Sequence, residues 1–286
     1  MAEAYYRRGL VWAQKGESDK AIADWTKTLD LDPQNTEACY SRGSVRLYRG
    51  EHDGAIEDFN TIINTKGENA EAFYRRGLAY WRQGRQDLAI SDFRAARRQN
   101  PRIGLYPPGR ALEGMTEEER ERILAEAEAA LERHPQEAAA YYRRGLARFS
   151  QGDYGRAIED FTAALQRNPQ YIEAYYARGR AYLEAKQWDH AMADFTTLIG
   201  DADDFTLRTP HPPGLAEFYY RRGFARYQKG DMEKALADLD QALKLHPAYV
   251  EAYETRGTVR QALGQEAEAQ ADYRMARILE ADETQH

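Results

Sequence analysis

Residues 138–171 read AAAYYRRGLARFSQGDYGRAIEDFTAALQRNPQY, and this 34-residue pattern recurs along the chain. Its Arg-Gly pair is found seven times, with the glycines at Gly9, Gly43, Gly77, Gly145, Gly179, Gly223 and Gly257. Most steps between these glycines are 34 residues, with one step of 68 and one of 44. A fixed period of this length indicates one supersecondary unit that is copied and stacked, because no single copy buries its own apolar face.

The marks inside the unit predict two helices. If the glycine is numbered position 8, the units begin at residues 2, 36, 70, 138, 172, 216 and 250. Position 20 is always Ala and position 24 is always large, while Ala21, Ile22, Trp25 and Leu29 have helical spacing. A glycine near position 15, as at Gly50, is typical of a left-handed helix end. Each unit is therefore expected to be helix A, a turn, helix B and a second turn, with a proline at position 32 in four copies.

This pattern resembles the tetratricopeptide repeat, which has the same period and a similar Gly, Tyr, Ala, Phe and Pro signature. The resemblance covers nearly the whole chain. It implies an all-α fold, a right-handed α-α superhelix of seven regular repeats plus one degenerate repeat. The chain departs from the family at position 7, where Leu is common in the family and every copy here has Arg.

Two irregularities interrupt the period. The slot at 104–137 lacks Arg-Gly, and Pro107-Pro108-Gly109 would break a helix A there. Its second half begins with a capping box at Thr116 and reads as helix B. The expected organisation is three units at 2–103, a degenerate unit at 104–137 with a loop in place of helix A, units at 138–205, a Pro-rich insertion at 206–215 and units at 216–283.

A charge pair also follows the period, because position 7 is Arg and position 23 is Asp in all seven units. The degenerate unit keeps charged residues at the same places, Arg110 and Glu126. Both positions adjoin packed ones, which predicts a ladder of Arg–carboxylate bonds between helix A and a helix B. Such a ladder belongs to the scaffold, and losing one partner of a buried pair costs about 3–5 kcal/mol.

The family resemblance implies that the A helices line a concave groove in which peptides bind. Position 5 is rich in Tyr and position 6 in Arg, residues that interfaces favour, and position 12 adds large apolar side chains. The predicted groove residues are Tyr6, Arg7, Tyr40, Tyr74, Arg75, Trp81, Tyr142, Arg143, Phe149, Tyr176, Tyr220, Arg221 and Tyr227, with Leu105 and Tyr106 as loop candidates. The alternative for the position-5 tyrosines is packing between neighbouring A helices.

Charges at position 6 rank the candidate cations. Arg7, Arg75 and Arg221 each follow a Glu four residues earlier, whereas Arg143 follows Ala139. Arg143 is therefore the first choice for a ligand-facing cation. The Lys and Asn residues of the family's carboxylate clamp are absent from the matching positions, so that ligand mode is excluded.

The remaining features favour a non-enzymatic protein. The six histidines are scattered, no phosphate-binding glycine loop is present, and no catalytic, cofactor or metal site is expected. The net charge of −7 disfavours nucleic-acid binding. One cysteine and the absence of a leader or a long apolar run favour a cytoplasmic location.

The leading interpretation is a scaffold that binds a peptide or protein partner. One alternative is self-association through the uncapped N-terminal unit, or a role as the repeat part of a larger signalling or assembly protein. RNA binding by a helical repeat is a minor alternative.

Overall fold

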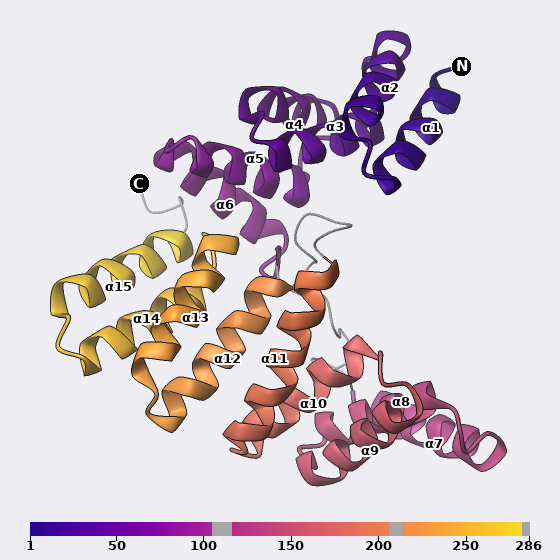
Figure 1. The fold of residues 1–286 in the computed structure, drawn as a ribbon, viewed down its shortest axis with the longest axis vertical. Coiled ribbons are helices and arrows are strands. Elements are labelled where there is room, and N and C mark those ends of the chain that lie inside the picture. Colours follow the sequence, from indigo (N-terminus) through magenta and orange to yellow (C-terminus); the bar gives the residue numbers. More distant parts are fainter. Residues whose placement is uncertain (105–115, 206–213, 282–286) are drawn as a thin grey trace.

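The computed structural model describes residues 1–104, 116–205 and 214–281, and in these ranges the chain forms fifteen α-helices and no strand (Figure 1). The helices are α1 (Ala2–Gln14), α2 (Ser18–Leu31), α3 (Thr36–Arg49), α4 (His52–Lys66), α5 (Ala70–Arg82), α6 (Gln86–Gln99), α7 (Glu117–Arg133), α8 (Ala138–Ser150), α9 (Tyr154–Arg167), α10 (Ile172–Glu184), α11 (Trp188–Phe205), α12 (Leu215–Lys229), α13 (Met232–Leu245), α14 (Val250–Ala262) and α15 (Glu266–Glu280).

Close packing inside each helix pair follows from the glycine at position 8. A Cβ at Gly145 would lie 2.6 Å from Phe161, the aromatic residue at position 24 of the same unit. Gly257 and Tyr273 repeat this arrangement at 2.7 Å. The glycine therefore lets helix A lie against the aromatic ring of helix B. The alanine at position 20 is fully buried in all seven units, as the close approach requires.

The turns between helices A and B also follow from the sequence. Gly50 and Gly230 follow helices α3 and α12 with φ of 80° and 87°, the left-handed conformation that glycine adopts without strain. In the turn between α10 and α11 the same conformation falls on Lys186, at φ 57°.

The Arg–Asp ladder is confirmed in all seven units. Each position-7 arginine donates to the position-23 aspartate of its own unit, with shortest distances between 2.5 and 2.8 Å. The pairs are Arg8–Asp24, Arg42–Asp58, Arg76–Asp92, Arg144–Asp160, Arg178–Asp194, Arg222–Asp238 and Arg256–Asp272. The ladder ties helix A to helix B within a unit.

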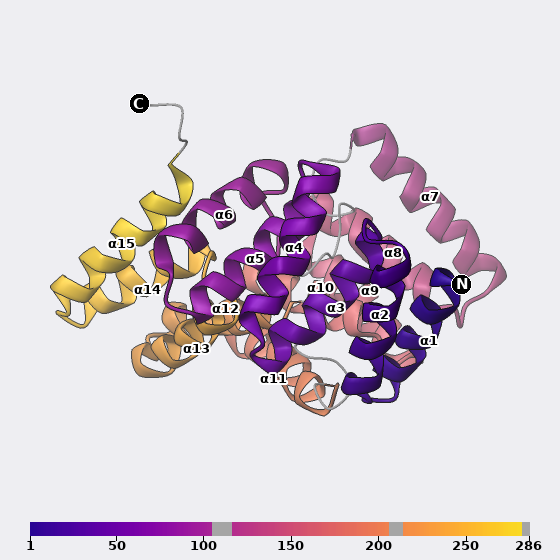
Figure 2. The same cartoon turned by 90° about the horizontal axis from the view of Figure 1, so that it is seen from above.

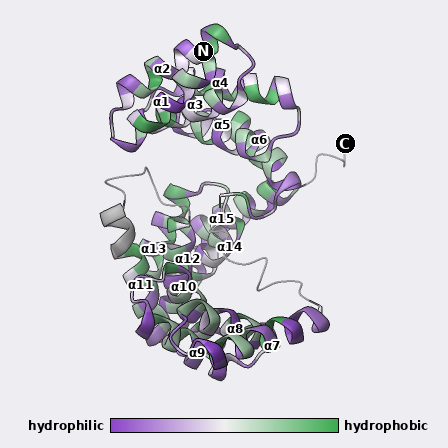
Figure 3. Ribbon diagram, turned by 90° about the vertical axis from the view of Figure 1, so that its right-hand side faces the viewer, coloured by the Kyte–Doolittle hydropathy of each residue, from purple (hydrophilic) through white to green (hydrophobic). Residues whose placement is uncertain are grey.

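The degenerate slot is only partly described. Helix α7 begins with the expected capping box, in which Thr116 Oγ1 accepts from the Glu119 backbone N–H and the Glu119 carboxylate accepts from the Thr116 N–H. The helix packs against α8 and is mostly hydrophilic (Figure 3). The expected loop at 104–115 and Arg110 fall outside the described residues, except for Gly104.

The chain stacks as two arrays. Helices α1–α6 form the first array and helices α7–α15 the second, and the last helices of the two, α6 and α15, contact each other (Figures 1 and 2). After α6 the chain makes a turn at residues 101–104, which we call the docked turn. Its Ile103 is buried in one apolar cluster with Tyr74 of the first array and Tyr249 of the second. The backbone carbonyl of Ile103 lies 2.8 Å from His246 Nε2.

Candidate protein-binding site

The position-5 tyrosines of α5, α8, α10 and α12 pack against neighbouring helices or turns. Tyr74 and Tyr176 are buried. The Tyr142 ring lies 5.0 Å from that of Tyr171, and the Tyr220 ring 4.8 Å from that of Tyr249. The bodies of these four rings are therefore packed, but mostly against helix B or a turn, and among the described residues only the Tyr176 ring contacts a ring of the next A helix, Phe218.

The predicted position-12 residues are also part of the packed interior. Trp81 is half-buried and its ring lies 6.3 Å from that of Phe93. Phe149 is buried against Tyr154. Tyr227 is half-buried beside the apolar cluster of the second array.

The first array has a pocket on its A-helix face. The pocket has a volume of about 200 Å³ and is lined by Tyr6 of α1, Tyr40 and Ser41 of α3, and Lys66 of α4, among others. Arg7, on the same helix as Tyr6, is 77% exposed and forms an ion pair with Glu3 at 2.5 Å. This pocket is therefore lined by both polar side chains and half-buried tyrosine rings.

Next to this pocket, three side chains from two units form a hydrogen-bonded group that we call the open triad. The Tyr40 hydroxyl donates to the Glu71 carboxylate at 3.1 Å, and Arg75 Nε donates to the same oxygen at 2.7 Å. The Arg75 guanidinium lies 4.9 Å from the centre of the Tyr40 ring. The Glu71 side chain remains 39% exposed, so this carboxylate is not enclosed by the protein.

The same triad recurs in the second array. The Tyr176 hydroxyl donates to Glu217, and Arg221 Nε donates to the same carboxylate oxygen at 2.9 Å. We call this group the covered triad, because the Glu217 side chain is only 1% exposed. The docked turn lies against it, with Arg102 Nη2 at 3.7 Å from Glu217 Oε1. The second array therefore already holds a basic segment of its own chain at the place that is open in the first.

Burial sets the protonation of both tyrosines. Burial raises the pKa of the Tyr176 hydroxyl to about 12, and it also raises the pKa of the Tyr40 hydroxyl. Both phenols are therefore neutral donors at physiological pH, and the carboxylate accepts from two donors at once.

The structure gives Arg143 an acidic neighbour that the position-2 pattern does not indicate. The arginine does lack a partner one turn earlier, but its guanidinium lies 3.6 Å from Glu137, the residue that caps α8. The cation is 56% exposed and has an acidic neighbour that the position-2 rule did not include. The loop candidates Leu105 and Tyr106 lie outside the described residues.

Among the described residues, no group of three or more His, Cys, Asp and Glu side chains is placed to hold a metal ion. Over the described helices, none is long and apolar enough to cross a membrane. Cys39 is buried, and burial raises the pKa of its thiol to about 11.

Sequence reasoning missed two parts of the site. Glu71 and Glu217 were recognised as partners of the arginines, but their bonds to a tyrosine of the preceding unit were not. The docked turn has no local signal, since Arg102 and Ile103 follow an ordinary helix-ending Pro101.

Comparison with protein families identifies the repeat. Tetratricopeptide repeat models match residues 2–35 and 138–171, a second tetratricopeptide model matches 40–102, and a further TPR repeat model matches 223–264. The chain belongs to the tetratricopeptide repeat family. A comparison with curated proteins finds no match.

The chain is similar to several solved structures. A double mutant of MamA from strain RS-1 superposes with a TM-score of 0.51 at 20% identity, over 67% of this chain and 94% of that one. MamA 41-end from Desulfovibrio magneticus RS-1 gives 0.45 at 18% identity, covering 75% and 96%. A tetratricopeptide repeat protein from Parabacteroides merdae gives 0.39 at 16% identity, covering 99% and 94%. This class of fold supports a protein-interaction scaffold.

Proposed function

We propose that the chain is a non-enzymatic scaffold whose first array binds a segment of a partner protein across the A helices α1, α3 and α5. The binding residues are Tyr6, Arg7, Tyr40, Glu71 and Arg75. The open triad is the centre of the site, and the pocket beside Tyr6 and Ser41 takes a neighbouring side chain of the partner.

One observation carries the proposal. In the covered triad, the same residue types bond to one carboxylate oxygen, and the group lies against Arg102 and the adjoining docked turn. The open triad has equivalent groups, and its Glu71 is accessible. A partner segment with a basic residue at its centre is therefore the chemistry that this face fits, since a carboxylate bonded by one arginine still has lone pairs for a second cation.

The test compares baits that differ at one carboxylate. The full chain, its Glu71→Gln variant and its Glu173→Gln variant are used to capture partners from lysate of the source cells, with identification by mass spectrometry. Glu173 is an exposed residue at the equivalent position 2 of another unit, so it controls for the loss of one negative charge. We expect Glu71→Gln to lose a partner that the other two baits retain.

Two results would contradict binding at the open triad. Equal capture by all three baits removes the open triad from binding. Loss with the Glu173→Gln bait alone transfers binding to the second array. Circular dichroism of each bait checks that the helices are intact.

A further inference from the structure

The position-7 arginine does more than pair with its own aspartate, because its remaining nitrogen reaches back to the preceding unit. In five units Nη1 donates to the position-25 side chain of the helix B before it, at 2.6–3.2 Å. The acceptors are Thr26, Asn60, Thr162, Thr196 and Asp240. Position 25 is thus the receiving side of the contact between successive units.

Position 28 is the apolar side of the same contact. It is Leu or Ile in every helix B that is followed by another unit in its array: Leu29, Ile63, Leu131, Leu165, Ile199 and Leu243. Leu165 packs with Tyr171, the last residue of its own unit, and with Tyr175 of the next unit, and Ile199 packs with Leu215 and Phe218. A hydrogen-bond acceptor at 25 and a branched aliphatic residue at 28 therefore define a face on which the next unit stacks.

Two helices lack both the hydrogen-bond acceptor at position 25 and the aliphatic residue at position 28. Helix α6 has Arg94 and Arg97 at positions 25 and 28, and helix α15 has Arg274 and Arg277 there. These are the last helices of the first and second arrays. An incoming position-7 arginine would meet a like charge at position 25, and the second arginine would be buried where a leucine belongs.

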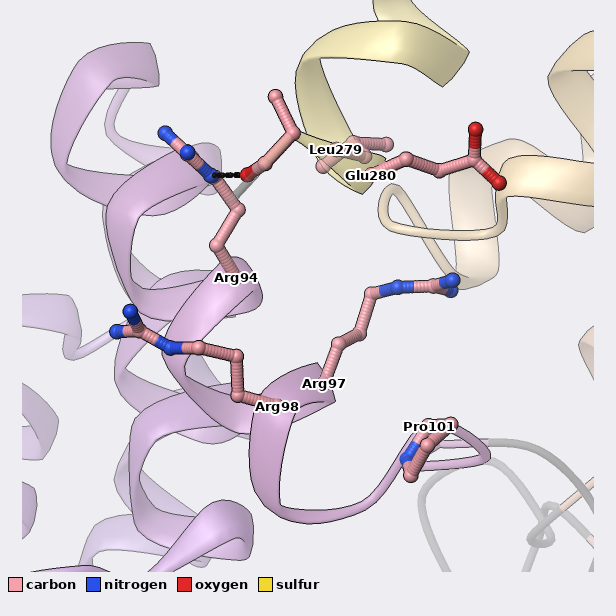
Figure 4. Close-up of a pocket in the computed structure, with 7 residues that line it drawn as sticks. Arg94, Arg97, Arg98, Pro101, Leu279 and Glu280 are labelled. Carbon is pink, nitrogen blue, oxygen red and sulfur yellow. Dashed lines mark hydrogen bonds between the residues drawn. The ribbon is translucent and has the colours of Figure 1, made fainter. Parts of the chain in front are cut away.

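We propose that this arginine pair is an end signal: it stops a further repeat from stacking, and in its place the face bonds to backbone carbonyl groups. This inference is independent of the proposed function of the first array. In α6 the selected partner is visible. Arg94 Nε donates to the carbonyl of Ala281 at 2.7 Å (Figure 4). Arg97 Nη1 donates to the carbonyl of Ala248 at 3.4 Å.

The seam between the arrays is built from these bonds. Arg94, Arg97 and Pro101 on one side and Leu279 and Glu280 on the other line a pocket of about 320 Å³ (Figure 4). The carbonyl of Ala281 follows the C-terminal end of α15, where the helix dipole favours a cation. The end of the first array is therefore seated on the end of the second and not on another repeat.

In α15 the arginine pair prevents a second copy of the chain from stacking on this helix. The A-helix that another copy would offer is α1, whose Arg8 is 58% exposed and has no bond from Nη1 among the described residues. Stacked on α15, Arg8 would face Arg274, and the apolar residues of α1 would face Arg277. Charge therefore blocks the stacking of α1 of one copy on α15 of another.

The test replaces the arginine pair of α15 with Thr and Leu, the residues that the first unit has at positions 25 and 28. The full chain with Arg274→Thr and Arg277→Leu is compared with the wild type by size-exclusion chromatography with light scattering over a range of concentrations. We expect the wild type to keep one mass, and the mass of the double variant to rise with concentration in steps of the 32.8 kDa chain. Adding Arg8→Ala to the double variant should reverse the assembly, since Arg8 donates to the new threonine.

Three results would overturn the proposal: an unchanged mass for a double variant with native circular dichroism, assembly that Arg8→Ala leaves intact, or wild-type assembly that Arg8→Ala abolishes. A second variant tests the seam and does not depend on self-association. Arg94→Thr with Arg97→Leu should raise amide exchange in residues 246–249 by about tenfold, for the loss of two hydrogen bonds. Unchanged exchange there refutes the role of the pair in α6.

Discussion

The Arg–Asp ladder makes a prediction that can be tested inside one chain, because its members differ in exposure. Asp160 is buried and accepts from Arg144 through Nε and Nη2 and from Arg148 through Nη1 at 2.8 Å. Asp160→Ala leaves two guanidinium groups without their carboxylate, and their side chains are only 22% and 19% exposed. Breaking a buried pair costs about 3–5 kcal/mol, and partial access of water to both arginines places the loss near 3 kcal/mol.

The matched control is Asp24→Ala in the first unit. Its partner Arg8 is 58% exposed, so water replaces the lost carboxylate. We expect the loss to be less than a third of that for Asp160→Ala. The free energy of unfolding is measured for both variants by urea titration followed by circular dichroism, and compared with the wild type.

Equal losses for the two variants would refute the reasoning, because exposure of the arginine would then not determine the cost. A loss below about 1 kcal/mol for Asp160→Ala would also refute it, since that is the value of an exposed pair. Either result would leave the ladder as a pattern of the sequence without the energetic role assigned to it.

Further predictions concern three other features. Gly145→Ala should lower the unfolding temperature, because its Cβ would lie 2.6 Å from Phe161, whereas Gly155→Ala, with no atom nearer than 3.9 Å, should raise it slightly; thermal unfolding of both decides. Burial lowers the pKa of His246 to about 4 from an ordinary 6.5. The free energy of unfolding should therefore be highest above pH 6.5 and should fall by about 3 kcal/mol as the pH is lowered to 4. Urea titrations at several pH values test this, and the His246→Gln variant should lose the pH dependence. Cys39, with its pKa raised to about 11, should resist iodoacetamide at pH 8 in the native chain and react in urea, as mass spectrometry would record.

The geometry of His246 explains why acid should loosen the joint between the arrays. Its Nδ1 accepts from the Ala248 N–H at 3.2 Å, so Nε2 carries the proton and donates to the Ile103 carbonyl. A second proton on Nδ1 would face the Ala248 N–H. Nearby Arg97 disfavours the charged ring and Glu217 favours it, but burial is the larger effect.

The helices and the ladder could be predicted because they repeat. A glycine and an aromatic residue copied seven times, or an arginine always 16 residues before an aspartate, have one simple explanation in a stacked unit. The packing of Tyr74 and Tyr176 between units could only be named as an alternative, because tyrosine serves equally well in an interface and in a half-buried seam.

The contacts between the arrays could not be predicted from the period. The bond from His246 to Ile103 joins residues 143 positions apart, and neither residue belongs to the repeat signature. Glu137 beside Arg143 was missed for a related reason. The rule that was applied considered only residues one helical turn away, and the partner lies just before the helix begins.

The central claim is that a partner binds the A-helix face of the first array. The most direct measurement places a photo-crosslinking amino acid at Ser41 in one variant and at Arg143 in another, both at position 6 of their units. After irradiation in lysate of the source cells, mass spectrometry maps the crosslinked peptides. We predict that Ser41 crosslinks to a partner segment with a basic residue, and that Arg143 does not. Crosslinks from the Arg143 position with none from the Ser41 position would contradict the claim.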